Sequence, residues 1–341
     1  MDQERLRDLL NSFAKLRLAV VGDFCLDRYL EIDAAHHELS IETGLPVYKV
    51  TRVRAQPGAA GTVLNNLVGL GVGTILPVGF CGDDGEGYEL ARALSSLPGI
   101  DLRHFLNTPQ RRTFTYCKPL LLASEQLPRE LSRLDSKNWS ATPEGVSEAL
   151  AKSVASLAGH VDAISVMDQV DIPETGVVTE AVRRELAQLA SQIPVLADSR
   201  SGLGLYPPLI FKLNRSELCA LQPGTPLPST TALETALEAL ADRNQCAAFV
   251  TLAEEGMLGA LPGQKALSVR SLPVRGPIDI VGAGDSVTAA LTAALAVGAS
   301  LGEAMELAML AASSTVHQVG TTGQARAEDL LEINRAFGSV A

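Results

Sequence analysis

The stretch LAVVGD, residues 18–23, decides the fold class of this chain. Its four apolar residues leave no polar face, which is typical of a parallel strand buried on both sides. Similar apolar runs recur at 161–167, 194–197, 209–213 and 247–252. Segments rich in Ala and Leu with helical spacing lie between and beyond them, at 143–158, 176–192, 231–243, 286–297 and 302–317. The alternation predicts an α/β fold with a doubly wound, mostly parallel sheet and helices on both faces.

Polar residues follow these predicted strands at their carboxyl ends. Asp23, Asp168 and Asp198 each come directly after an apolar run, and Asn214 follows a fourth run. Ligands of open α/β sheets bind in the crevice outside the carboxyl ends of the strands. The row of oxygen-bearing side chains therefore predicts a site for a polyhydroxylated or metal–phosphate ligand at this edge.

Two stretches, 28–54 and 111–135, interrupt the alternation of strands and helices. In both, apolar and polar residues alternate with a period of two, which is typical of half-exposed antiparallel strands. We expect these inserts to form a small β lid over the crevice, within a single domain that spans 1–341. Because exposed strand edges seek partners, we also expect a homodimer formed by exchange of the lids.

The composition excludes several classes of protein. Lys and Arg number 28 against 39 Asp and Glu, a formal net charge of −11, so neither a nucleic-acid partner nor an anionic membrane surface is expected. No apolar run is long enough to span a bilayer, and the charged start of the chain has no signal-peptide pattern. The five widely spaced cysteines predict free thiols in a reducing compartment, so we expect a cytoplasmic protein.

The stretch DIVGAGDS, residues 279–286, carries the strongest chemical signal. Its glycines allow a tight turn into the helix that follows, so that several backbone N–H groups converge on an anion at the helix start. Asp285 stands on the first helical turn, where its carboxylate could accept a proton from a substrate hydroxyl. The alternative is that Asp285 only caps the helix.

The stretch NRSE, residues 214–217, follows a predicted strand. Asn and Glu three residues apart at a helix start form a capping box, which is the structural interpretation. In the functional interpretation, Asn214 and Glu217 orient water on Mg²⁺ beside nucleotide phosphates, because Mg²⁺ keeps several of its waters. Both interpretations remain open on sequence alone.

Two further stretches indicate that a ligand comes close to the backbone. The stretch PGAAGT, residues 57–62, opens a predicted helix, and its small residues suit either a ligand or tight helix–sheet packing. Asp27 follows the first predicted strand, and its carboxylate could accept hydrogen bonds from sugar hydroxyls or cap a turn. These residues predict an acceptor site at the start of the first lid insert.

These motifs, in this order, resemble the ribokinase-like (PfkB) carbohydrate kinases over nearly the whole chain, and most closely the D-glycero-D-manno-heptose 7-phosphate kinases. The residues that carry the resemblance are VGD 21–23, LDRY 26–29, PG 57–58, GDD 82–84, RLD 133–135, Asn214 with Glu217, VTL 250–252, and GAGD 282–285. The resemblance implies ATP-dependent phosphoryl transfer to a hydroxyl of a sugar or sugar phosphate, with ATP and Mg²⁺ as the cofactors.

The resemblance also implies roles for individual residues. Asp285 would be the catalytic base, and the backbone of Gly282, Ala283 and Gly284 would form the anion hole. The sugar site would comprise Asp27, Gly58, Ala59, Thr62 and Asp168. The nucleotide site would comprise Asn214, Arg215, Ser216, Glu217, Thr251 and Gly256, with Asn214 and Glu217 also serving Mg²⁺ through water. Asp279 and the carbonyl of Val281 match positions that bind a monovalent cation, such as K⁺, in many relatives.

Two departures from the family pattern concern the acceptor. The family's Gly-Gly-x-x-Asn turn reads GAAGT at 58–62, so Ala59 replaces the second glycine and Thr62 replaces the sugar-binding Asn. The Lys that heptose kinases carry shortly after the position of Asp168 is absent, which removes a cation for a sugar phosphate. The alternatives are therefore a kinase for another sugar or a nucleoside, and a non-catalytic homologue that binds sugar or nucleotide.

Overall fold

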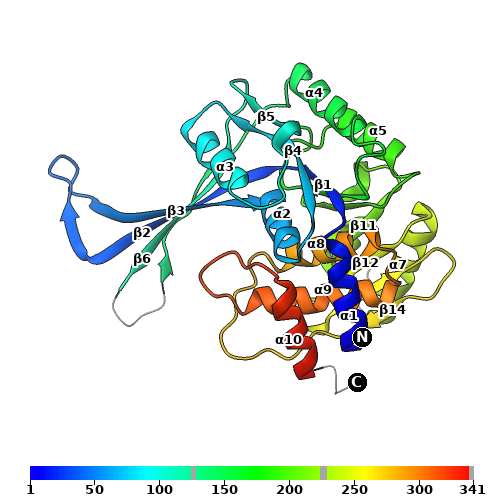
Figure 1. The fold of residues 1–341 in the computed structure, drawn as a ribbon. Helices are drawn as coiled ribbons and strands as arrows, with labels where there is room; N and C mark the ends of the chain where they lie inside the picture. The colour runs from blue at the N-terminus through cyan, green and yellow to red at the C-terminus, as the bar shows by residue number, and fades with distance from the viewer. Residues whose placement is uncertain (124–127, 223–228, 338–341) are drawn as a thin grey trace.

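A nine-stranded sheet forms the centre of the computed structural model, which describes residues 1–123, 128–222 and 229–337 (Figure 1). Its strand order is β14-β13-β12-β11-β10-β9-β1-β4-β5. Every neighbouring pair from β5 to β12 is parallel, whereas β13 and β14 run antiparallel. The strands are β1 (Arg17–Gly22), β4 (Thr74–Gly82), β5 (Phe105–Thr108), β9 (Ala163–Asp168), β10 (Val195–Ser199), β11 (Ile210–Asn214), β12 (Ala248–Thr251), β13 (Met257–Ala260) and β14 (Leu267–Val269).

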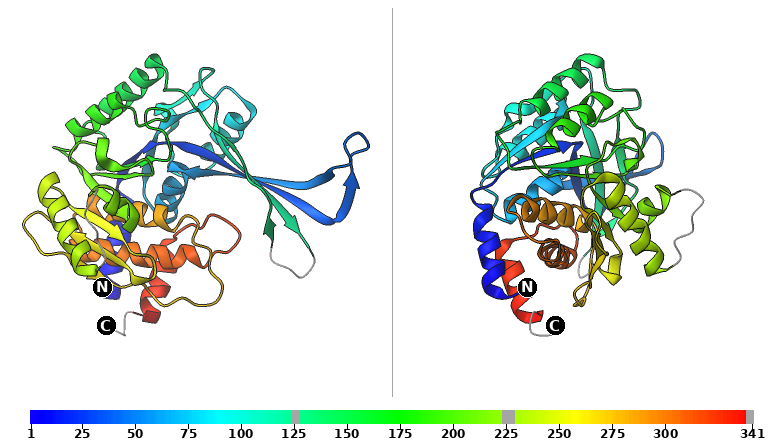
Figure 2. Two further views of the ribbon diagram at one scale, coloured as in Figure 1. Left: turned by 180° about the vertical axis from the view of Figure 1, so that it is seen from behind. Right: turned by 90° about the vertical axis from the view of Figure 1, so that its right-hand side faces the viewer.

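Helices cover both faces of this sheet and bury two separate cores (Figure 2). The first core takes side chains from α1 (Gln3–Phe13), α2 (Ala60–Gly69), α3 (Gly85–Ser95), α8 (Ala283–Ala296), α9 (Leu301–Val316) and α10 (Ala327–Phe337). The second takes them from α4 (Glu144–Ala155), α5 (Glu180–Leu189), α6 (Arg215–Ala220) and α7 (Thr230–Asn244). Short 3₁₀ helices span Leu102–His104, Leu203–Leu205 and Ala253–Glu255. The predicted doubly wound α/β fold is confirmed.

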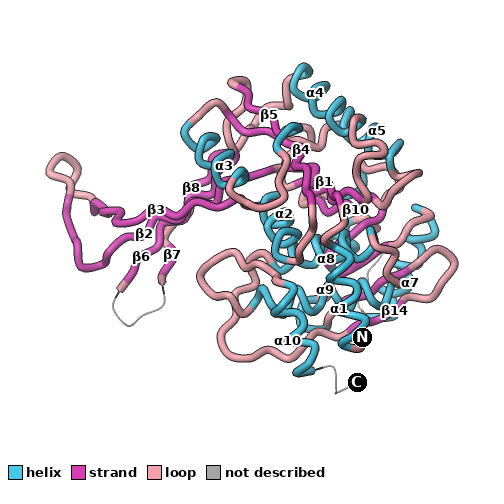
Figure 3. The backbone as a smooth tube through the Cα atoms, viewed as in Figure 1, coloured by secondary structure: helices cyan, strands magenta, loops and turns pink. Residues whose placement is uncertain are grey.

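A second sheet, built from the two predicted lid inserts and called the lid below, projects from the main body (Figure 3). It contains β2 (Phe24–Leu39), β3 (Pro46–Ala59), β6 (Phe114–Leu122), β7 (Arg129–Glu130) and β8 (Leu134–Ser136). The two predicted inserts thus pair with each other. The strands of the first run from 24 to 59, beyond the predicted 28–54, and those of the second run from 114 to 136, close to the predicted 111–135. The expectation of antiparallel pairing throughout was wrong, because β2 and β6 are parallel. Period-two alternation fixes the faces of a strand but not the direction of its neighbour.

Two expectations that rest on composition can be compared with the structure. No helix in the described part of the chain is long and apolar enough to cross a bilayer. All five cysteines carry free thiols, with Cys25 and Cys81 buried and the other three half-buried.

The helix predicted over 176–192 begins only at Glu180, where the hydroxyl of Thr179 caps its first turn. The residues before it instead form the loop that leads away from β9.

Candidate active site

The carboxyl ends of the parallel strands meet at one edge of the main sheet, as predicted. Gly22 lies opposite Met167, Asp168 lies opposite Ser199, and Asn214 lies opposite Thr251. These register pairs bring the polar ends of β1, β9, β10, β11 and β12 together along the edge where the sequence predicts the ligand crevice. The lid sheet begins at the same edge, because β2 starts at Phe24, directly after β1.

Helix α8 enters this crevice with an uncapped N-terminus. Its N-cap is Gly282, which has a φ of +84° and no side chain to accept from the helix amides. The first N–H groups of a helix lack intrahelical acceptors and carry partial positive charge, so they favour an anion. A Cβ at Gly282 would lie 2.8 Å from Cγ2 of Thr322, so only glycine fits here without displacing that residue.

Asp285 lies on the first turn of α8 with a half-buried side chain. It is not the N-cap, so the alternative of a simple helix cap does not describe it. Among the described residues its carboxylate has no hydrogen-bond or ion-pair partner, which leaves both oxygens available to a substrate. Burial raises the pKa of Asp285 to about 7, and the negative charge of Asp198 adds to the shift. A carboxylate with that pKa is suited to accept a proton near neutral pH.

A buried ion pair lies under the start of α8, and sequence reasoning missed it. Nζ of Lys212 lies 2.7 Å from Oδ2 of Asp198, and the Thr288 hydroxyl donates to the same oxygen at 2.9 Å. A Cβ built on Gly284 would lie 3.4 Å from Nζ of Lys212, so this cation reaches the anion-binding turn. The available signal was a lysine inside the apolar stretch 209–213, because a charge in a buried strand needs a partner.

Asn214 and Glu217 form the capping box of α6. The Asn214 side chain accepts from the Glu217 amide at 2.9 Å, and Glu217 Oε2 accepts from the Asn214 amide at 2.7 Å. Burial raises the pKa of Glu217, and the negative charge of Asp198 contributes to the shift. Glu217 therefore caps its helix and lies within electrostatic range of Asp198 and Lys212. The capping interpretation is confirmed, and it leaves the second carboxylate oxygen of Glu217 free of protein contacts among the described residues.

The other predicted nucleotide residues gather around the ends of β11 and β12. Thr251 lies beside Asn214 and donates its hydroxyl to the carbonyl of Leu213 at 3.3 Å. Arg215 forms an ion pair with Glu255, and Ser216 is exposed. Gly256 has a φ of +102°, and a Cβ there would lie 2.1 Å from the carbonyl oxygen of Val269, so glycine is required.

Asp279 anchors the loop before α8 to the loop after α9. Its Oδ1 accepts from the Val281 amide at 3.0 Å, and its own amide donates to the carbonyl of Val316 at 2.8 Å. Oδ2 of Asp279 lies 3.4 Å from the amide nitrogen of Gly320. The two residues predicted to bind a monovalent cation thus lie next to each other. They share this place with a third segment, around 316–320, that the sequence analysis did not assign.

Asp27 is held by two partners on the inner face of the lid. Nζ of Lys118 lies 3.1 Å from its Oδ1, and the Thr322 hydroxyl donates to its Oδ2 at 3.2 Å. The Tyr29 hydroxyl lies 3.1 Å from Oγ1 of Thr322, which ties the strand to the C-terminal loop. Asp27, Lys118 and Thr322 are all buried. Sequence reasoning found Asp27 but missed Lys118 and Thr322, because neither stands in a recognisable motif.

The 58–62 turn lies against both Asp27 and the start of α8. A Cβ at Gly58 would lie 2.8 Å from Cγ of Asp27, so the lid backbone approaches the carboxylate closely. Thr62 is buried, and its Cγ2 lies 3.5 Å from where a Cβ of Gly282 would stand. Ala59 adopts a φ of +53°, a region that disfavours every residue with a Cβ. The structure thus brings Asp27, Gly58 and Thr62 together beside Gly282.

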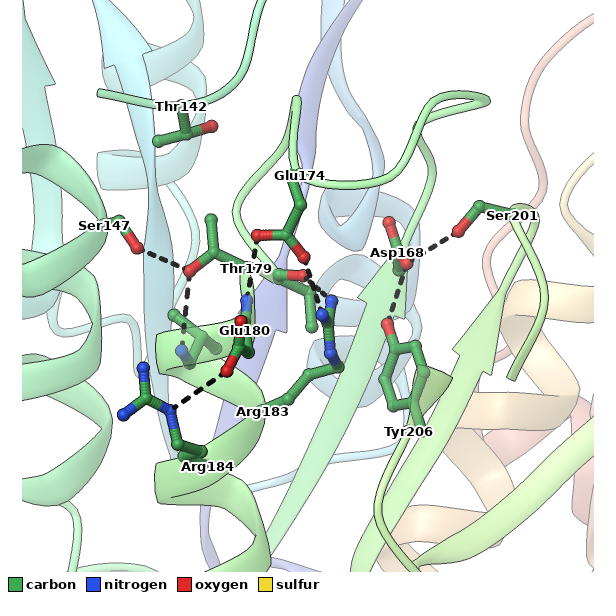
Figure 4. Close-up of polar contacts among 12 residues, drawn as sticks. Thr142, Ser147, Asp168, Glu174, Thr179, Glu180, Arg183, Arg184, Ser201 and Tyr206 are labelled. Carbon is green, nitrogen blue, oxygen red and sulfur yellow. Dashed lines mark hydrogen bonds and ion pairs between the residues drawn. The ribbon is translucent and has the colours of Figure 1, made fainter. Parts of the chain in front are cut away.

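Asp168 is the predicted sugar residue that accepts the most side-chain hydrogen bonds. Its Oδ2 accepts hydrogen bonds from the hydroxyl groups of Tyr206 at 2.8 Å and Ser201 at 3.1 Å (Figure 4). The Ser199 hydroxyl donates to the same oxygen at 2.9 Å. Burial raises the pKa of Asp168, and these three hydroxyl groups oppose the shift. In the neighbouring strand end, Asp23 accepts from the Val177 and Gln169 amides, and burial together with Asp168 raises its pKa to about 7. Both acids therefore connect loops at the crevice floor.

The fold is similar to those of solved sugar kinases. Arabidopsis thaliana ribokinase, solved with ribose and ATP, superposes with a TM-score of 0.67 at 20% identity over 93% of this chain and 98% of that one. Escherichia coli phosphofructokinase-2, solved with substrates and products, gives a TM-score of 0.71 at 19% identity over 95% and 99%. At these identities the likeness establishes the ribokinase-like fold.

Sequence comparison then gives the family. The model of the pfkB family carbohydrate kinases matches residues 15–327, so the chain belongs to that family and is a sugar kinase of it. It is 30% identical over 335 residues to the bifunctional protein HldE of Azorhizobium caulinodans, and 30% identical over 341 residues to HldE of Geotalea uraniireducens. These alignments cover 95% and 98% of this chain, but only 66% of the length of each relative.

Proposed function

We propose that this sugar kinase transfers the γ-phosphoryl group of ATP to a hydroxyl of a heptose 7-phosphate or a closely related sugar phosphate. The observation that carries the proposal is the free carboxylate of Asp285 on the first turn of a helix whose N-terminus has no side-chain cap. Such a helix end binds the transferring phosphoryl group, and the acid beside it accepts the proton of the attacking hydroxyl. The two functions lie within one turn of the same helix.

In the proposed reaction, the acceptor oxygen attacks the γ-phosphorus, and the bond from that phosphorus to the bridging oxygen of ADP breaks. The proton of the acceptor hydroxyl moves to Asp285. The amides at Gly282, Ala283 and Gly284 stabilise the negative charge on the equatorial oxygens of the transferring phosphoryl group. The positive charge of Lys212, whose Nζ lies close to Gly284, adds to this stabilisation. The lid excludes water, so that ATP is not hydrolysed in place of transfer.

The residues at the end of β11 fit a hydrated Mg²⁺ ion. Described residues contain no cluster of three acids, histidines or cysteines able to hold a metal directly. Glu217 offers one free carboxylate oxygen, and the elevated pKa of its carboxyl reflects a burial that a nearby divalent cation would offset. We propose that Asn214 and Glu217 hold Mg²⁺ through its waters, where the ion neutralises phosphate charge. Asp279 and the Val281 carbonyl are proposed to hold K⁺ near the start of α8.

On the acceptor side, we propose that the sugar binds between Asp27, Gly58, Ala59 and Thr62, with Asp168 shaping the floor. The carboxylate of Asp27 is already held in place by direct contacts with Lys118 and Thr322. The resemblance to heptose 7-phosphate kinases supports the choice of acceptor. The missing Lys after Asp168 is the specific observation that favours a second candidate, a kinase for an unphosphorylated sugar.

Three broader features belong to the same proposal. Residues 1–341 act as one kinase unit, in which strands of the two inserts form the lid. Two copies associate through exposed apolar residues of that lid. The protein works in the cytoplasm, an assignment supported by its five free cysteines.

The test of the proposal is a comparison of Asp285→Asn with the wild type. We expect turnover to fall by about three orders of magnitude or more, because the proton acceptor is lost, while acceptor affinity changes little. Asp8→Asn, which removes an exposed acid on α1 outside the family motifs, serves as the control and should keep full activity. ADP release is measured over a panel that includes the heptose 7-phosphate, free sugars, other sugar phosphates and nucleosides.

Two results would contradict the proposal. An Asp285→Asn enzyme with near-normal turnover would remove Asp285 from the chemistry. ADP release with none of the panel, from protein that still binds ATP and sugar, would favour the non-catalytic homologue.

A further inference from the structure

The two carboxylate oxygens of Asp168 have different surroundings. Three hydroxyl groups donate to Oδ2, whereas Oδ1 accepts no hydrogen bond from the residues that the structure describes. Oδ1 is also not among the buried side-chain atoms that lack a partner, so it keeps contact with solvent. Two of the hydroxyl groups, from Ser201 and Tyr206, come from the segment after β10 (Figure 4). Asp168 thus has one oxygen held by the protein and one open to a ligand.

Tyr206 makes the shortest of the three hydrogen bonds, at 2.8 Å. The hydroxyl groups of Ser199 and Ser201 lie 3.1 Å apart, so each of them can also turn toward the other. Burial, together with the negative charge of Asp168, raises the pKa of the Tyr206 phenol well above its ordinary value. The phenol therefore keeps its proton and remains a donor to Asp168.

Arg183 supports the other side of Tyr206. Its guanidinium carbon lies 5.7 Å from the centre of the Tyr206 ring. Arg183 stands on α5, is only 8% exposed, and donates to the Val178 carbonyl at 2.8 Å and to the Glu174 carboxylate at 2.6 Å. A cation over the face of a phenol ring attracts its electrons. The hydroxyl of that ring becomes a stronger donor as a result.

Glu174 holds Arg183 at the cost of backbone strain. It has a φ of +67°, a region that disfavours every residue with a Cβ. Its carbonyl accepts from the Thr142 amide at 2.7 Å, and its second carboxylate oxygen accepts from the Glu180 amide at 3.0 Å. A strained residue persists only where its surroundings fix it, and such residues gather at functional sites. The strain indicates that the place of Arg183 matters to more than stability.

The charges around Asp168 act on its protonation. Burial favours the neutral acid, whereas the hydroxyl groups on Oδ2 and the positive charge of Arg183 favour the carboxylate. Asp23, at the end of β1, is the neighbouring anion. Arg200 is a further cation at this strand end, and its amide donates to the Asp168 carbonyl at 2.9 Å. Only the charged carboxylate can accept a hydrogen bond at Oδ1 without first giving up a proton.

We infer that Tyr206 and Arg183 are positioning residues, which hold Asp168 as a charged carboxylate with Oδ1 turned toward a hydroxyl group of the acceptor. The inference rests on the proposed function, because it takes Asp168 as part of the sugar site. Neither Tyr206 nor Arg183 stands in the motifs by which the chain resembles its family.

The test measures acceptor binding by calorimetry, with a non-hydrolysable ATP analogue present, near pH 6 and near pH 9. The probe is the heptose 7-phosphate, or the sugar of the panel with which the wild type releases ADP. Tyr206→Phe keeps the ring and removes the donor. It should raise the Kd of the probe by about tenfold near pH 6 and by clearly less near pH 9, where the carboxylate regains its charge. Binding of the ATP analogue should be unchanged.

Double variants show whether Tyr206 acts through Asp168. In an Asp168→Asn background, Tyr206→Phe should weaken binding no further, because the group that it positions is already lost. Arg183→Gln should act in the same direction as Tyr206→Phe, and Arg183→Lys, which keeps the charge, should recover most of the affinity. Arg184→Gln changes an exposed arginine on the next position of α5 and serves as the control.

Three results would overturn the inference: a Tyr206→Phe protein that binds the probe like the wild type, a loss of affinity that is equal at both pH values, or a full further loss in the Asp168→Asn background. The last two would make Tyr206 a support of the fold alone. The proposed function fails separately, by the absence of ADP release from the wild type. Should the Arg183 variants not fold, the comparison of Tyr206→Phe at two pH values decides the matter.

Discussion

Thr322 connects the acceptor carboxylate to the phosphate-binding turn through a single side chain. Its hydroxyl donates to Asp27, and its methyl group packs against Gly282. A buried hydrogen bond to a charged group contributes about 1.5–3 kcal/mol, so its loss should weaken acceptor binding at Asp27. Thr322 therefore serves as a positioning residue for Asp27.

We predict that Thr322→Val, which keeps the shape and removes the hydroxyl, raises the acceptor KM by about tenfold or more. The KM for ATP should stay the same, because the methyl contact with Gly282 is retained. Thr322→Ser should recover the acceptor KM, and Thr321→Val is the neighbouring control. A lower acceptor KM in Thr322→Val would show that the sugar displaces this hydroxyl and would refute the positioning role.

The pKa of Asp285 gives the reaction a pH dependence with a definite sign. The base must be deprotonated to act, and burial together with Asp198 raises its pKa to about 7. We predict that kcat/KM rises with pH through about 7 and levels off above it. Asp198→Asn should move the midpoint to lower pH, because it removes a negative neighbour and leaves the Lys212 charge unopposed. A wild-type profile that is flat from about pH 5.5 to 8.5 would contradict this role.

At the scale of elements, the turn into α2 carries local strain. Ala59 has a φ of +53°, although the chain could place glycine there at no steric cost. We predict that Ala59→Gly raises the free energy of unfolding by about 1 kcal/mol, measured by urea denaturation with an unchanged m-value. The neighbouring Ala60→Gly, at a buried helical position, should lower it by about 0.5–1 kcal/mol. Equal effects of the two substitutions would show that the turn is unstrained.

Sequence patterns predicted those elements whose environment is uniform along their length. The strand at 18–21 is apolar throughout because both faces are buried, and the helix predicted over 143–158 shows its buried stripe of Val146, Leu150 and Val154. The GAGD turn was predicted as an anion site because its glycine pattern is local. Contacts that join distant segments gave no such signal. Thr322 meets Asp27 across 295 positions of the chain, and the parallel pairing of β2 with β6 depends on the whole lid.

At the scale of the whole molecule, the lid extends from the main body and carries exposed apolar side chains. They lie along β2, β3 and the turn between them: Leu39, Ile41, Leu45, Val47, Tyr48, Val50 and Val53. Apolar residues grouped on one projecting element are costly in water and mark an interaction surface. The same two strands carry Asp27 and Gly58 nearer the main body, so a partner that covers their exposed residues would also hold the acceptor site in shape.

We predict that the protein is a homodimer in sedimentation experiments and that Val53→Glu converts it to a monomer, because a charge would be buried at the interface. Leu267→Glu places the same charge on β14, at the far end of the main sheet, and should leave the dimer intact. The monomeric variant should also bind the acceptor more weakly while keeping its affinity for ATP, since only the acceptor side depends on the lid. A wild-type protein that sediments as a monomer at every concentration, with full activity, would refute the assignment of this surface to a second copy.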